Sequence, residues 1–80
     1  MQTARADIHL TQPQQIVAAV VPHDVGLDIR AAFAHDPANW FRRPSFRLWS
    51  MAMRQLLHSR GFYVTPDDFV PLVVEALNLR

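Results

Sequence analysis

The longest helical pattern of apolar and polar positions in this chain runs from Pro44 to Arg60. At 100° per residue, the apolar side chains fall in one arc about 180° wide. Together with Arg60, this arc holds Phe46, Leu48, Trp49, Ala52, Met53, Leu56 and Leu57. The opposite side carries Arg43, Arg47, Ser50, Met51, Arg54 and His58. We therefore expect a helix over 44–60 with one buried face and one basic face, around which the rest of the chain packs.

The ends of this central helix carry recognisable signals. Pro44 suits the first helical turn, where its missing N–H costs nothing, although Ser45 as N-cap is the alternative. Gly61 follows the pattern and can take the left-handed conformation that a C-cap needs.

A first helix is expected over 12–21. Thr11 and Gln14 have the spacing of a capping box, and Pro13 suits the first turn. The run 16–21 is rich in β-branched residues and would also serve as a buried strand. The capping signal and the lack of a clear pairing strand favour the helix.

Two shorter elements follow Pro22, which is expected to stop the first helix. Residues 23–26 are expected to form a turn and 27–35 a second helix. Asp36 and Pro37 then have the order of an N-cap and a first helical residue, which predicts a single helical turn over 37–41.

The last helix is expected over 66–78. Thr65 is a suitable N-cap, Pro66 suits the first position, and Asp67 and Asp68 meet the positive end of the helix dipole. Pro71 conflicts with a regular helix, because it removes a hydrogen bond, so we expect a kink there or a helix that begins at Pro71.

The elements together predict an all-α domain, a small bundle of four main helices plus one short helical turn. Residues 1–80 form one domain, in which 1–10 make a loosely packed N-terminal arm. Hydrophobic residues make up 50% of the chain, which is more than one small core can hide. That excess favours a homodimer or a partner surface.

Charge and composition exclude several classes of protein. The net charge is +1, far from that of a typical nucleic-acid binder, and all eight basic residues are arginine. The chain has no cysteine, no signal-peptide pattern and no apolar run of membrane-spanning length, so we expect a cytoplasmic location.

A basic and aromatic cluster around the start of the central helix is the strongest candidate binding site. Its residues are Trp40, Arg42, Arg43, Arg47, Arg54 and His58. Arginines on one face suit the phosphates of a nucleic acid or the carboxylates of an acidic partner protein, and exposed aromatic rings would stack on bases. The alternative is a solvated helix face with its aromatic residues buried.

A second candidate surface is the apolar side of the last helix. We expect a face for a second copy or a partner there, formed by Val70, Val73, Val74 and Leu77.

No catalytic residue, metal site or cofactor is expected. The serines lack a nucleophile elbow, and the two glycines are too far apart for a phosphate loop. The histidines lack metal-ligand spacing, which leaves only a pairing of His23 with His35 by the fold.

The sequence thus predicts a small non-enzymatic protein-interaction or oligomerisation module. The alternative is a nucleic-acid-binding accessory protein that uses the same arginines.

Overall fold

A computed structural model describes residues 9–80, which form α-helices and one 3-10 helix and contain no strand. The elements are α2 (Gln12–Val20), α3 (His23–His35), η1 (Trp40–Arg42), α4 (Pro44–Ser59) and α5 (Pro66–Ala76). The predicted all-α class is therefore confirmed. Of the predicted arm over 1–10, residues 1–8 lie outside the described residues.

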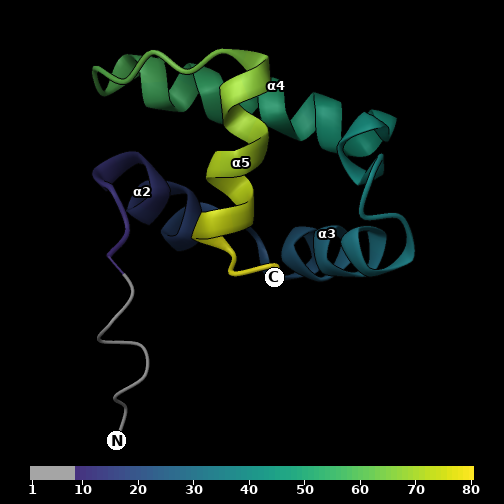
Figure 1. The fold of residues 1–80 in the computed structure, drawn as a ribbon. Coiled ribbons are helices and arrows are strands. Elements are labelled where there is room, and N and C mark those ends of the chain that lie inside the picture. The colour runs from purple at the N-terminus through teal and green to yellow at the C-terminus, as the bar shows by residue number, and fades with distance from the viewer. Residues whose placement is uncertain (1–8) are drawn as a thin grey trace, which may run out of the picture.

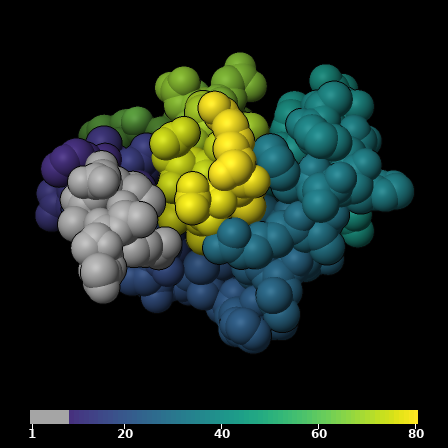
Figure 2. Space-filling view, turned by 60° about the horizontal axis from the view of Figure 1, so that its bottom comes forward, coloured from purple at the N-terminus to yellow at the C-terminus, as the bar shows by residue number. Residues whose placement is uncertain are grey.

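The helix α5 runs through the middle of the fold. It crosses α4 and then descends between α2 and α3 (Figure 1), and it packs directly against α2 and α4. Its C-terminal end lies in the centre of one face of the molecule, yellow in Figure 2, beside the blue and teal residues of α3. The chain is therefore organised around α5 as much as around α4, because α5 is apolar on most of its surface.

The core joins all five elements. η1 packs against both α3 and α4, which brings its tryptophan between them. The buried apolar residues are Val17, Ile29, Ala32, Trp40, Phe46, Met53, Leu57, Phe69, Val73, Val74 and Leu77.

The helix ends predicted from side-chain caps are confirmed. The backbone N–H of Thr11 donates to Gln14 Oε1 at 2.8 Å, and the N–H of Gln14 donates to Thr11 Oγ1 at 3.3 Å, which completes the capping box. This settles residues 16–20 as helix rather than strand. At the start of α5, the N–H of Asp68 donates to Thr65 Oγ1 at 3.1 Å.

The C-terminal ends of α4 and α5 share one motif. Gly61 has φ +92°, and the N–H of Phe62 donates back to the Leu57 carbonyl at 2.9 Å. Asn78 takes the same place after α5 with φ +53°. Both ends are Schellman motifs, in which a left-handed residue turns the chain and satisfies carbonyls of the last turn. α5 therefore ends at Ala76, two residues before the predicted end.

The prediction for α3 is wrong at its start. Residues 23–26 were predicted as a turn, but they form the first turn of α3, and the N–H of Gly26 donates to the Pro22 carbonyl at 2.9 Å. Pro22 is the extended N-cap residue, and Asp24 lies in the first turn, where the helix dipole favours a negative charge. Gly26 therefore lies inside the helix, where no left-handed turn is needed.

The single turn begins three residues later than predicted and ends one residue later, at Arg42. Asp36 is the C-cap of α3, so residues 37–39 form an ordinary turn before η1 begins at Trp40. Pro44 is the first residue of α4 and Arg43 is its N-cap, so the alternative with Ser45 as the cap is wrong.

The buried face of α4 is rotated from the predicted one. Phe46, Ser50, Met53 and Leu57 are buried, whereas Leu48 is 72% exposed and Ala52 is exposed as well. The apolar arc is wider than the contact that α2, η1 and α5 make with this helix. One edge of the arc therefore lies in solvent, and Ser50 is buried in its place.

The two glycines of this chain should respond oppositely to alanine. Gly26→Ala places a Cβ inside a helix with no heavy atom within 4 Å, so we expect a gain of about 0.5–1 kcal/mol. Gly61→Ala also meets no neighbour, but its φ of +92° strains any L side chain, and we expect a loss of about 1 kcal/mol. Thermal melts should show shifts of opposite sign, and shifts of the same sign would contradict the assigned backbone conformations.

Candidate binding groove between α4 and α5

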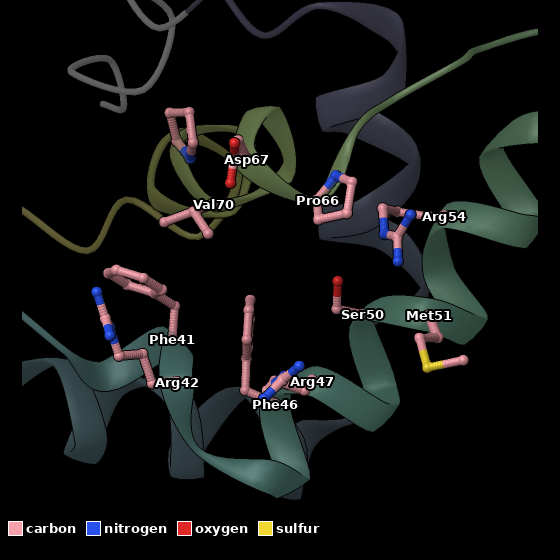
Figure 3. Close-up of a pocket in the computed structure, with 11 residues that line it drawn as sticks. Phe41, Arg42, Phe46, Arg47, Ser50, Met51, Arg54, Pro66, Asp67 and Val70 are labelled. Atoms are coloured by element: carbon pink, nitrogen blue, oxygen red, sulfur yellow. The ribbon is translucent and has the colours of Figure 1, made fainter.

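A groove of about 610 Å³ opens between α4, α5 and η1. In Figure 3, residues of α5 form one wall and residues of α4 and η1 form the other, with Phe46 and Val70 projecting into the space between them. The apolar lining residues are Phe41, Phe46, Met51, Pro66, Val70 and Pro71. The polar ones are Arg42, Arg47, Ser50, Arg54 and Asp67.

The helical period brings the α4 side chains to this groove. Arg47, Ser50, Met51 and Arg54 are spaced three and four residues apart, so they share one face of the helix. Ser50 is buried, because its position coincides with the buried face, while Met51 at the rim is exposed. The same helical period therefore supplies both a buried residue and the charged edge of the groove.

The groove is positively charged. Three guanidinium groups and the single carboxylate of Asp67 line it, which leaves a formal local charge of +2. The Nε atom of Arg54 is buried and has no hydrogen-bond partner among residues 9–80. An unpaired buried donor costs about 1–3 kcal/mol.

The start of α4 adds to this positive potential. Its N-cap, Arg43, makes no capping hydrogen bond, and no acidic residue lies in the first turn. The positive end of the helix dipole therefore coincides with arginine side chains, an arrangement that does not favour the helix itself. The guanidinium carbon of Arg42 lies 5.8 Å from the centre of the Phe41 ring, a cation–π distance that supports this arginine at the rim.

Pro71 contributes a feature of the α5 wall. α5 is continuous from Pro66 to Ala76, so the alternative of a helix that begins at Pro71 is wrong. Since proline has no N–H, it cannot donate the hydrogen bond that the Asp67 carbonyl would receive in a regular helix. Both residues line the groove.

The structure brings half of the predicted binding residues together. Arg42, Arg47 and Arg54 line the groove, while the exposed Arg43 lies outside it at the N-cap. His58 lies in an adjoining hollow of about 230 Å³, which shares Met51 and Arg54 with the groove. There its ring centre lies 4.4 Å from that of Tyr63.

The prediction that Trp40 contacts a ligand is wrong, because its side chain is only 2% exposed. Its ring lies 5.8 Å from Phe33, 5.8 Å from Phe41 and 4.9 Å from Phe46, all in edge-on arrangements. The indole is therefore the centre of an aromatic core cluster and presents no face to a ligand.

The apolar partner face predicted on α5 is not a surface. Val73, Val74 and Leu77 are buried in the core of the chain itself, because α5 is covered on several sides by its neighbours. Val70 is half-buried and lines the groove.

Sequence reasoning missed the other lining residues of the groove, which are Phe41, Phe46, Ser50, Met51, Pro66, Asp67 and Pro71. The helical spacing of Ser50 and Met51 to the arginines was visible in the sequence. The α5 wall was not, because the side of α5 that meets α4 depends on the packing of the whole chain.

The histidine pairing considered for a metal site is also wrong. His23 and His35 are the first and last residues of α3, which places them about 18 Å apart at 1.5 Å per residue. Within residues 9–80, no group of three histidine, aspartate or glutamate side chains has a geometry suited to a metal ion.

No helix of the part of the chain that the structure describes is long and apolar enough to cross a membrane. No protein-family model matches this chain, and neither a curated protein nor a solved structure matches it.

Proposed function

We propose that this chain is a non-enzymatic interaction module that binds an acidic, amphipathic segment of a partner protein in the groove between α4 and α5. The observation that carries this proposal is the apolar floor of the groove between three arginines. Apolar anchors of the segment would cover Phe41 and Val70, which line the groove and are half-buried, and its carboxylates would pair with Arg47 and Arg54. Bidentate arginine–carboxylate pairs are among the stronger charge-assisted contacts.

The shape of the groove favours a helical segment. A groove between two helices accepts the apolar face of a third helix, with anchors three and four residues apart. Its volume of about 610 Å³ lies in the range of pockets that hold several apolar side chains.

Nucleic acid, the alternative from the sequence, has less support. Binding to single strands relies on open aromatic faces, but Trp40 and Phe46 are buried and Phe41 and Trp49 are half-buried. Tyr63 has an open aromatic face, because its side chain is 80% exposed, but it does not line the groove.

The location of such a partner stays a prediction. The chain lacks cysteine, which suits a reducing compartment, and a cytoplasmic partner is the simplest expectation.

A pair of designed peptides tests the proposal. Both have sixteen residues with leucines at positions 5, 8, 9 and 12; one carries glutamates beside them and the other carries lysines. Fluorescence anisotropy should give the acidic peptide a Kd of about 10–100 µM at low salt, and at least about tenfold weaker binding for the basic peptide. Added salt should weaken the acidic complex, because rim charges are screened.

Two comparisons complete this test. Arg30→Ala removes an exposed arginine of α3 outside the groove and should leave the affinity unchanged, whereas Arg47→Ala should weaken it. Equal affinity for both peptides would refute the charge argument. Displacement of the acidic peptide by a mixed oligonucleotide pool, with tighter binding of the pool, would instead favour the nucleic-acid alternative.

A further inference from the structure

The outward side of α4 carries an exposed stripe that the groove does not use. Its members are Ser45, Leu48, Ala52, Leu56 and Ser59, which we call the α4 stripe. At 100° per residue, the five positions fall within about 80° of one another. Leu48 is 72% exposed, Ala52 is exposed and Leu56 is half-buried, so the centre of the stripe is an apolar surface in solvent.

The α4 stripe is symmetric about Ala52. Leucines lie four residues before and after it, and serines lie seven residues before and after it. A two-fold axis through Ala52 that pairs two antiparallel helices therefore places Leu48 against the partner's Leu56, and Ser45 against the partner's Ser59. A two-fold interface requires this self-complementarity, since each contact occurs twice.

We propose that a second copy of this chain docks on the α4 stripe, with the two α4 helices antiparallel. Ala52 at the centre lets the helix axes approach at the short end of the usual 8–10 Å range. The leucines on either side then close over it. Antiparallel alignment also places the positive end of each helix dipole beside the negative end of the other.

The charges at the ends of the α4 stripe suit this arrangement. Asp24 and Asp28 of α3 border a small hollow together with Ser45 and Trp49, at the N-terminal end of α4. Arg60 follows the other end of the helix. The proposed two-fold axis lies in the interface, perpendicular to both α4 helices. It places the C-terminal end of one α4 beside the N-terminal end of the other, along the same edge of the interface. Arg60 therefore approaches the partner's Asp24 and the partner's Asp28. Rim charges of this kind select the partner and the register.

The α4 stripe and the groove lie on different sides of α4. The groove uses Arg47, Ser50, Met51 and Arg54, none of which belongs to the stripe. A dimer therefore leaves both grooves open, and the two proposals stand or fall separately.

Sedimentation equilibrium between about 5 µM and 1 mM tests the association itself. A contact along one 16-residue helix is small, so we expect a weak dimer with a Kd of about 10–100 µM. Leu48→Glu should weaken it at least tenfold, without lowering the melting temperature of the dilute monomer. Leu27→Glu is the matched control, because Leu27 is 54% exposed on α3, outside the stripe, and it should leave the Kd unchanged. A monomer at all concentrations, or a dimer lost with Leu27→Glu and kept with Leu48→Glu, would overturn the proposal.

Single cysteines test the symmetry, since the chain has no cysteine of its own. Ala52→Cys lies on the proposed axis and should form a disulfide-linked dimer under mild oxidation, because facing Cα atoms must lie about 4.4–6.8 Å apart. Ser45→Cys should not link to itself, but it should link when mixed with Ser59→Cys. Efficient self-linking of Ser45→Cys would indicate a parallel pair and would overturn the antiparallel arrangement, whether or not the groove binds its peptide.

Discussion

Trp40→Ala is expected to remove a large part of the folding stability of this protein. The indole is 2% exposed and lies where η1 joins α3 to α4, in edge-on contact with Phe33, Phe41 and Phe46. Removing a buried tryptophan costs about 3–5 kcal/mol. A domain of 80 residues has about 4–12 kcal/mol of stability in total, so this loss removes much of it.

Thermal unfolding followed by circular dichroism measures this effect. Since about 1 kcal/mol shifts the midpoint of a domain this size by 4–8 °C, we expect the Tm to fall by at least about 12 °C. Trp40→Phe keeps an aromatic ring in the cluster, so its Tm should fall by less than that of Trp40→Ala. If Trp40→Ala melts within a few degrees of the unchanged protein and loses peptide binding instead, the indole is a contact residue and its assigned core role is wrong.

Reversing the charge of the groove should have the largest effect on binding. Arg47→Glu/Arg54→Glu places two carboxylates where the proposal has the partner's carboxylates, so attraction becomes repulsion at both positions. We expect the acidic peptide to lose at least about 100-fold in affinity, which corresponds to about 2.7 kcal/mol. The basic peptide should gain affinity for the same variant, because the apolar floor is unchanged.

A matched pair of substitutions separates local charge from net charge. Arg30→Glu/Arg80→Glu changes the total charge by the same amount at exposed positions that do not line the groove. It should change both affinities by less than about threefold, as expected for distant charges screened by salt. Equal effects from the two double variants would mean that the peptides respond only to the overall charge of the protein.

Local signals in the sequence were enough to predict much of the secondary structure. Capping residues indicate where α2 and α5 begin, because their side chains satisfy N–H groups that a helix start leaves unpaired. These residues are Thr11 with Gln14 for α2 and Thr65 before Pro66 for α5. Gly61 states where α4 ends, because few other residues accept its φ of +92°. These features depend on residues a few positions apart, so no knowledge of the fold is required.

Predictions from the sequence failed where a residue is compatible with two structural roles. Gly26 suggested a turn, yet it lies inside α3, since a glycine costs a helix only about 1 kcal/mol and packing can offset that. Leu48 was expected in the core and lies in solvent, because the apolar arc of α4 exceeds the surface that its neighbours cover. The period of a helix indicates which residues share a face, but it does not say how much of that face is covered.

The candidate site also combines residues that local spacing predicts with residues that only the packing of the chain brings together. The arginines on α4 were recognisable because their spacing is local, and Arg42, Arg47 and Arg54 do meet at one groove. Trp40 was misplaced because an aromatic residue beside arginines suits both an interface and a core. Val70 and Asp67 come from a helix far along the chain, and only the crossing of α5 over α4 brings them to the arginines.

The central claim is that the groove between α4 and α5 holds an acidic segment. A titration of ¹⁵N-labelled protein with the acidic peptide, followed by amide chemical shifts, tests it most directly. We predict saturable shifts at Ser50, Arg54, Asp67 and Val70, with little change along α2 and the first turns of α3. Shifts confined to α2 and α3, or a spectrum that the peptide leaves unchanged at millimolar concentration, would contradict the account.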